Sequence, residues 1–141
     1  NNVTSIGHSA FENCTNLKEF AIPQGLTTIE SEVFYGCRSL KEIIIPSGVT
    51  VIRDAFKNCS SITNIVIPDN VTNMDSMFWA CYKIKKLDVS KWDTSQVYNM
   101  RGLFGGCQEL RSLDVSNWDT SNASDMNAMF TGCQSITSLD L

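Results

Sequence analysis

Cysteine and histidine are the side chains of this sequence best suited to nucleophilic, acid–base or metal chemistry, and the chain holds six cysteines and one histidine. The cysteines recur every 22 to 26 residues, at positions 14, 37, 59, 81, 107 and 133. A zinc site needs closely spaced cysteine pairs or histidines beside them, and neither arrangement occurs. The regular interval instead indicates that each cysteine fills the same position of a structural repeat.

The single histidine, His8, lies in a predicted turn between Ile6 and Phe11 and has no counterpart in the other repeats. We expect it to be a solvated loop side chain rather than a catalytic base. The sequence contains no nucleophile elbow, no phosphate-binding glycine loop and no His-Glu-x-x-His pair. We therefore expect a protein that is not an enzyme and needs no cofactor.

Cysteines stacked in a repeat can be either joined by disulfides or reduced. Stacked cysteines have α-carbons about 4.8 Å apart, which lies inside the range for disulfides. Their β-carbons, however, point the same way at about the same spacing, beyond the usual range of about 3.5–4.5 Å. We expect a buried, reduced cysteine ladder, with disulfides and metal binding as the less favoured alternatives.

Apolar residues recur at fixed positions around each cysteine, and these columns predict the structural elements that hold the cysteines in place. A phenylalanine stands three residues before every cysteine, and leucine or isoleucine stands three residues after it. With the other recurring positions this makes 8 columns in 6 repeats, and all 48 positions are apolar or cysteine. The pattern predicts coils stacked so that equivalent residues lie above one another and bury a continuous core.

Each coil is predicted to contain one short strand and one tight return. Ile43 and Ile45 alternate with an outward residue, and Pro46 ends the strand because proline cannot donate to a ladder. On the return side, segments such as residues 31–35 are short enough for one helical or 3₁₀ turn. Five of the six residues before the cysteines are glycine or asparagine, which tolerate left-handed backbone; Ala80 is the exception and predicts a different closure.

Composition and charge limit the classes of partner. The 141 residues are 43% hydrophobic and 18% charged, and no segment approaches the ~20 apolar residues that span a bilayer, so we expect no membrane insertion in this segment. The net charge of −4 is spread evenly, because residues 1–70 carry 5 basic and 7 acidic side chains and residues 71–141 carry 6 and 8. Without a basic half, nucleic acid is a poor partner.

The repeats carry a family resemblance. In repeats 1 to 3, stretches such as LTTI at 26–29 and IIIP at 43–46, on either side of Phe-x-x-Cys-x-x-Leu, resemble BspA-type leucine-rich repeats. In repeats 4 to 6, motifs such as WDTS at 92–95 recur 26 residues further on and resemble the repeat of bacterial surface lipoproteins. The resemblance implies an α/β-type solenoid, a right-handed leucine-rich-repeat coil with one parallel β-sheet and short helical, 3₁₀ or irregular turns opposite.

The same resemblance implies a function class. It indicates a bacterial or parasitic-protist protein, at the cell surface or secreted, whose repeats bind host matrix proteins or other cells. We expect a non-enzymatic recognition and adhesion module for protein or glycan ligands. The alternatives are a structural spacer that projects other domains from the surface and, with less support, an intracellular scaffold.

We expect one domain over residues 1–141, built from six repeats at 3–25, 26–48, 49–70, 71–96, 97–122 and 123–141. The chain has no initiator methionine, and both ends lack the polar capping repeat that solenoids need for solubility. We therefore expect a piece of a longer protein. Otherwise the end coils should fray or pack end to end with another copy.

The outward residues of the predicted strands form the first candidate binding surface. Ile44 and Val66 occupy the same outward position in neighbouring repeats and would lie side by side, next to Lys41 and Glu42. An exposed apolar pair bordered by charges is a plausible contact surface for a ligand.

Trp79 and Tyr82 form the second candidate, because both replace residues that are mostly polar at the equivalent positions. An exposed aromatic pair could anchor a ligand. The alternative is local, since the repeat lengthens at repeat 4 and the rings would cover the resulting mismatch.

In repeats 4 to 6 the outward strand position holds Asp88, Asp114 and Asp140. Stacked carboxylates repel, so their charges must be offset. Three explanations stay open: structural compensation by nearby cations or by hydrogen bonds from Ser90 and Ser116, a bound calcium ion, which prefers oxygen ligands, or direct contact with a partner.

Overall fold

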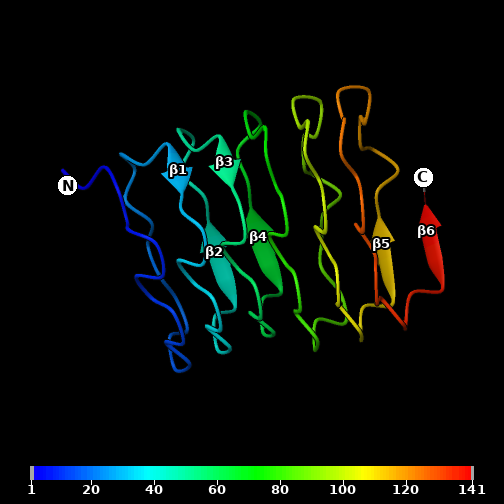
Figure 1. The fold of residues 1–141 in the computed structure, drawn as a ribbon, viewed down its shortest axis with the longest axis horizontal. Helices are drawn as coiled ribbons and strands as arrows, with labels where there is room; N and C mark the ends of the chain where they lie inside the picture. Colours follow the sequence, from blue (N-terminus) through cyan, green and yellow to red (C-terminus); the bar gives the residue numbers. More distant parts are fainter. Residues whose placement is uncertain (1, 141) are drawn as a thin grey trace.

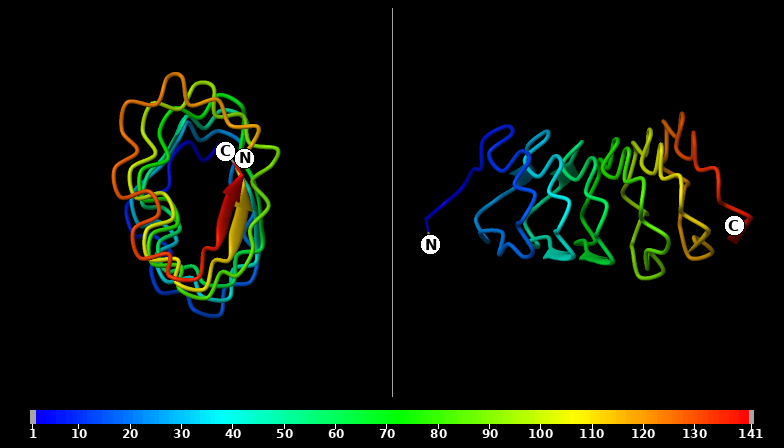
Figure 2. Two further views of the ribbon diagram at one scale, coloured as in Figure 1. Left: turned by 90° about the vertical axis from the view of Figure 1, so that its right-hand side faces the viewer. Right: turned by 90° about the horizontal axis from the view of Figure 1, so that it is seen from below.

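The computed structural model describes residues 2–140, with the backbone alone at Asp140. Successive repeats form loops that lie side by side along the longest axis, and the two ends of the chain lie at opposite ends of that axis (Figure 1). Viewed along the axis, the loops lie over one another around a common interior (Figure 2). Equivalent residues of neighbouring repeats are thereby brought together.

Six short strands lie in two rows across these loops (Figure 1). They are β1 (Thr28–Ile29), β2 (Glu42–Ile44), β3 (Val51–Ile52), β4 (Asn64–Val66), β5 (Ser112–Asp114) and β6 (Ser138–Asp140). Strands of consecutive repeats pair in parallel as β1–β3, β2–β4 and β5–β6. The expectation of one parallel sheet is therefore wrong, because the described residues form three separate two-stranded sheets.

The row that contains β1 and β3 continues through single bridges rather than strands. Val51 bridges to Asn73, Asn73 to Asn99, and Asn99 to Asp125. In Asn73, Asn99 and Asp125, the side-chain oxygen accepts a hydrogen bond from the backbone N–H two residues further along the chain, at 3.0, 2.9 and 2.9 Å. This local bond turns the chain directly after each bridge, so a longer strand cannot form there.

The returns are tight turns. The described residues contain no helix, and hence none long and apolar enough to cross a membrane. Each turn region holds two residues with left-handed backbone four positions apart, for example Glu32 (φ 60°) and Gly36 (φ 68°). A right-handed helix cannot continue through such a residue, so two linked turns replace the predicted helical or 3₁₀ return. Ala80 (φ 60°) adopts the same conformation, which corrects the expectation of a different closure there.

Backbone hydrogen bonds tie each turn region to the next repeat. The Phe34 N–H donates to the Ala55 carbonyl at 3.0 Å, and the Gly36 N–H donates to the Lys57 carbonyl at 2.9 Å. The equivalent pair of bonds recurs at every junction between repeats. Every turn region therefore depends on its neighbour for the hydrogen bonds that its backbone requires.

The phenylalanine column runs through the middle of the core. Phe34, Phe56 and Phe78 are fully buried, and their ring centroids are stacked 5.4 and 6.1 Å apart. Trp92 and Trp118 form a second stack, with ring centroids 5.8 Å apart, as their equivalent positions predict. Stacked rings fill the interior without gaps and contribute beyond the area that they bury.

The junction between repeats 3 and 4 is looser on the side of β2 and β4. At the other four junctions, the residue four positions after the cysteine donates its N–H to the carbonyl of its counterpart in the preceding repeat, as Lys41 does to Lys18. Among the described residues, no such bond joins Lys85 to Thr63. The two repeats are therefore not tied together at this point.

The same junction disturbs the phenylalanine stack. The rings of Phe56 and Phe78 are inclined by 23°, whereas the other neighbouring phenylalanines of the column lie within 9° of parallel. Repeat 4 is the first of the longer repeats, and the extra residues of repeats 4 and 5 form loops that project beyond the shorter ones (Figure 1). The inclined rings therefore lie at the junction where the repeat length changes.

Replacing Phe56 with alanine should lower the free energy of unfolding by about 3–5 kcal/mol, because it removes a fully buried ring that is stacked on both sides. Phe11 is only partly buried, in the first repeat, so Phe11→Ala should cost clearly less. Urea denaturation followed by circular dichroism measures both losses. Equal losses would contradict the stacking argument.

Candidate functional site

The cysteines form a ladder of thiol hydrogen bonds along the core. From repeat 2 onward, each thiol donates to the backbone carbonyl of the phenylalanine in the preceding repeat, at Sγ–O distances between 2.9 and 3.4 Å. All six cysteines are free thiols, and the four in repeats 2 to 5 are buried. The predicted burial is wrong at the two ends, because Cys14 is exposed and Cys133 only partly buried in the outermost repeats.

Burial keeps the inner thiols protonated. Removal from water raises the pKa of Cys37 to about 11 and that of Cys107 to about 12, and a neighbouring thiol adds to each rise. The pKa values of Cys59 and Cys81 are raised for the same reasons. Since the thiolate is the form that attacks electrophiles and binds metals, the ladder is suited to packing rather than to either chemistry.

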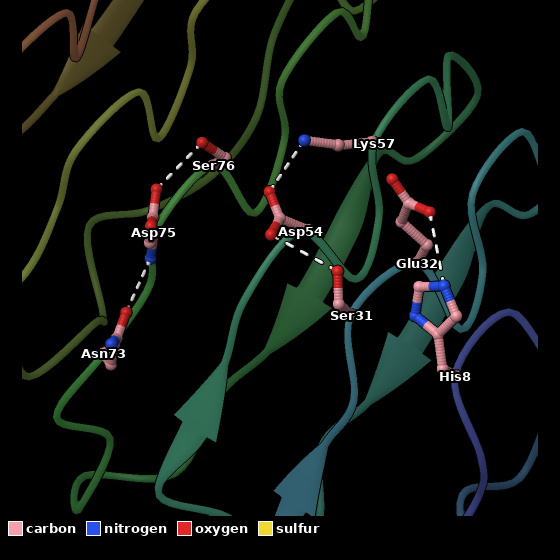
Figure 3. Close-up of polar contacts among 8 residues, drawn as sticks. All are labelled: His8, Ser31, Glu32, Asp54, Lys57, Asn73, Asp75 and Ser76. Atoms are coloured by element: carbon pink, nitrogen blue, oxygen red, sulfur yellow. Dashed lines mark hydrogen bonds and ion pairs between the residues drawn. The ribbon is translucent and has the colours of Figure 1, made fainter.

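Beside the turn regions, polar side chains contact one another in small groups of two or three (Figure 3). His8 is exposed, as expected, and its Nε2 lies 3.7 Å from Glu32 Oε2. The Ser31 hydroxyl donates to Asp54 Oδ2 at 3.4 Å, and Asp54 Oδ1 lies 2.8 Å from Lys57 Nζ. Because its hydroxyl is directed to Asp54, Ser31 is not paired with His8 in the way that a nucleophile is paired with its base.

Serine hydrogen bonds hold Asp88 of repeat 4 and Asp114 of β5. Asp88 Oδ1 accepts bonds from the hydroxyl (2.7 Å) and backbone N–H (3.1 Å) of Ser90, and Asp114 Oδ1 accepts the same two bonds from Ser116 at 2.6 and 3.1 Å. These bonds, chiefly those from the hydroxyls, lower the pKa of both carboxyl groups. Structural hydrogen bonding therefore explains these two positions.

Calcium binding stays an untested prediction. It involves Asp140 as well as Asp88 and Asp114, and the side chain of Asp140 lies outside the described part of the structure. In the described part, no three histidine, cysteine, aspartate or glutamate side chains gather closely enough to hold a metal ion.

Ile44 and Val66 form an exposed apolar pair, which we name the strand-face patch. They lie in register across β2 and β4, and they are 67% and 51% exposed. Lys41 and Glu42 are exposed at the start of the same strand. A shallow groove of ≈ 620 Å³ borders Ile44 and is lined largely by apolar residues of repeats 1 and 2. The structure thus brings the four residues of the first candidate surface together.

Trp79 and Tyr82 are not brought together in one hollow. The indole of Trp79 lies against Gly102 and Gly105 of the next repeat, where an added β-carbon on Gly102 would come within 2.9 Å of the ring. Tyr82 borders a different depression, together with Arg38 and Lys83. These contacts favour the local alternative for Trp79, in which the ring covers the surface of the longer repeats.

The structure contains a hollow between repeats 3 and 4 that the sequence does not predict. We name it the junction hollow. It is lined by Lys41, Lys83, Lys85 and Lys86 together with three hydroxyl side chains. The even spread of charge along the chain conceals this cluster. A signal exists in the column four residues after each cysteine, which holds lysine or arginine in four of six repeats: Lys18, Lys41, Lys85 and Arg111.

In the folded protein, a colorimetric thiol reagent at mildly alkaline pH should modify Cys14 first and Cys133 more slowly. The four buried cysteines should react only on unfolding, because their thiols are covered and their pKa values are raised. A Cys14→Ser variant should lose the fast phase. The denatured, unreduced protein should release six free thiols, and fewer would reveal a disulfide.

Lowered aspartate pKa values imply a defined pH dependence of stability. The bonds from Ser90 and Ser116 stabilise the fold fully above the ordinary carboxyl pKa of about 4, and this contribution is lost as the pH falls through the lowered pKa of the folded state. The double variant Ser90→Ala/Ser116→Ala should therefore melt below wild type at neutral pH, with a gap that closes in acid. Ser47→Ala, at an exposed serine, serves as the control; a gap that persists in strong acid would contradict the assignment.

Comparison with known proteins places the repeats in a family. The family model described as "BspA type Leucine rich repeat region (6 copies)" matches residues 1–110. No curated protein matches the chain.

Two solved structures resemble this one. A leucine-rich cell surface protein of Faecalibacterium prausnitzii has a TM-score of 0.69 and 24% identity, over 85% of this chain and 31% of that protein. A leucine-rich repeat protein of T. pallidum has a TM-score of 0.67 and 28% identity, over 92% of this chain and 59% of that protein. The chain thus spans less than two thirds of either relative. The repeat columns, the paired parallel strands and the matching family model agree, and the chain belongs to the BspA-type leucine-rich repeat family.

Proposed function

We propose that the chain is a non-enzymatic recognition module, displayed at the cell surface or secreted, that binds protein ligands through the strand face of repeats 1 to 3. The observation that carries this proposal is the strand-face patch, in which Ile44 and Val66 expose most of their apolar surface side by side. Exposed apolar area of this kind is costly in water and is typical of contact surfaces.

The surroundings of the patch support protein contact. Protein interfaces have an apolar centre and a polar margin, and here Lys41 and Glu42 border Ile44 while the adjoining groove adds apolar residues. Ile43 and Ile65, the neighbours of the two patch residues along β2 and β4, are buried in the core. The backbone beneath the patch is therefore already held in place, and binding would require little further ordering.

The proposal extends to the architecture. We propose that residues 1–141 form one domain, a right-handed solenoid of six repeats. The turn-region hydrogen bonds at every junction support this, because they leave no point at which the chain separates into two bodies. The F. prausnitzii relative is described as a cell surface protein, and that location is the one we propose for this chain.

Changing Ile44 to aspartate should weaken binding to any extracellular-matrix protein that the wild-type chain binds, with a rise in Kd of at least about tenfold, because a contact would bury an unpaired carboxylate. Biolayer interferometry against a panel of purified matrix proteins measures this. Ser112→Asp, which places the same charge on the strand face of repeat 5, is the matched control and should bind as wild type.

Two results would count against the proposal. Unchanged binding of Ile44→Asp would exclude the strand-face patch as the contact surface. A wild-type chain that binds no protein of the panel would favour the structural spacer instead.

A further inference from the structure

The junction hollow lies where the strand-side contacts between repeats are interrupted. Thr63 donates its N–H to the Lys41 carbonyl at 2.9 Å, but within the described residues Lys85 makes no equivalent bond to Thr63. The opening measures ≈ 490 Å³ and is lined by residues of repeats 2, 3 and 4, including the buried Ile62 and Ile84. The hollow thus lies where the strand-side hydrogen bond between repeats 3 and 4 is missing.

Four lysines surround this hollow, and no carboxylate lines it. Lys41, Lys83, Lys85 and Lys86 are all exposed. In the described part of the chain, Lys85 alone among them forms an ion pair, because its Nζ lies 3.6 Å from an oxygen of the exposed Glu109. The hydrogen bonds from Ser90 chiefly lower the pKa of Asp88, and the charge of Lys86 contributes to that lowering. Like charges gathered in this way repel one another and lower stability. A bound anion would relieve that repulsion, even though the chain as a whole carries a charge of −4.

A smaller depression continues the hollow toward the turn regions. Arg38 and Tyr82 line it, and it shares Ser60, Ser61 and Lys83 with the junction hollow. The side chain of Tyr82 is 44% exposed. Cations, hydroxyl groups and one aromatic ring therefore follow a single shallow path across repeats 2 to 4.

The chemistry of this path favours an anionic polysaccharide. Lysine ammonium groups are point charges that can meet anionic groups from many directions, the serine hydroxyls can bond sugar oxygens, and the face of Tyr82 can pack against a sugar ring. Phosphopeptide sites are built from arginine clusters, and single-stranded nucleic acids need several stacking aromatic rings. The path offers one arginine and one aromatic ring.

We infer that the junction hollow and the adjoining depression form a binding site for a sulfated polysaccharide. Sulfate groups along such a chain meet Lys83, Lys85 and Lys86, and one sugar ring lies on Tyr82. The inference rests on the proposed function, since a surface module is exposed to such glycans, but it assigns a different ligand to a surface that shares only Lys41 with the surroundings of the strand-face patch.

Heparin fragments of defined length serve as the probe, immobilised on a sensor at physiological ionic strength. The double variant Lys83→Gln/Lys86→Gln should raise the Kd about tenfold, because it removes two of the exposed charges. Its melting temperature should stay the same or rise, because the repulsion is reduced. Arg53→Gln/Lys91→Gln is the matched control, because it makes the same change of net charge at exposed positions outside the hollow, and it should bind within about twofold of wild type.

Two further probes identify the ligand class. Unsulfated hyaluronan and a single-stranded oligonucleotide of matched charge should both bind more weakly than heparin. Absence of heparin binding, equal losses in the two double variants, or tighter binding of either comparison probe would overturn the inference. Failure here leaves the matrix-protein result standing, because that assay uses another ligand and the Ile44→Asp variant.

Discussion

The fold depends on hydrogen bonds that each repeat can complete only with its neighbours. The N–H of a core phenylalanine donates to a carbonyl of the following repeat, and each inner cysteine thiol donates to a phenylalanine carbonyl of the preceding one. A repeat on its own would leave these groups unpaired, at a cost of about 1–3 kcal/mol for each group buried in that state. Stacking is therefore the condition under which any repeat can fold.

That dependence separates the positions that the fold fixes from those that it leaves free. Inward residues such as Phe56 and Cys59 sit between identical neighbours, so a change in size at one level disturbs the levels beside it. Outward residues meet no such limit, and the same strand position holds Ile44 in repeat 2 and Asp114 in repeat 5. The surface can thus change from apolar to acidic along one molecule while the core stays the same.

This separation also explains how far the sequence allowed prediction. The core columns and the buried thiols of the inner repeats followed from residue types, because burial admits few of them, and the exposure of Ile44 followed from its alternation with Ile43 and Ile45. The left-handed backbone at Ser76 did not, because its residue type does not reveal that its N–H donates to the Arg101 carbonyl of the next repeat. The junction hollow was equally hidden, because it forms only where Lys41 of repeat 2 and residues of repeat 3 are folded against the lysines of residues 83–86.

The missing strand-side bond between repeats 3 and 4 has a mechanical consequence. At the other junctions the strand side adds a hydrogen bond between neighbouring repeats, whereas here the turn side, the bridge between Val51 and Asn73 and the core hold the two repeats together. A sideways force that opens the strand side would meet less resistance at this junction than at the junctions on either side of it. The turn regions of repeats 3 and 4 would stay joined while the strand side opened, because their hydrogen bonds continue across this junction.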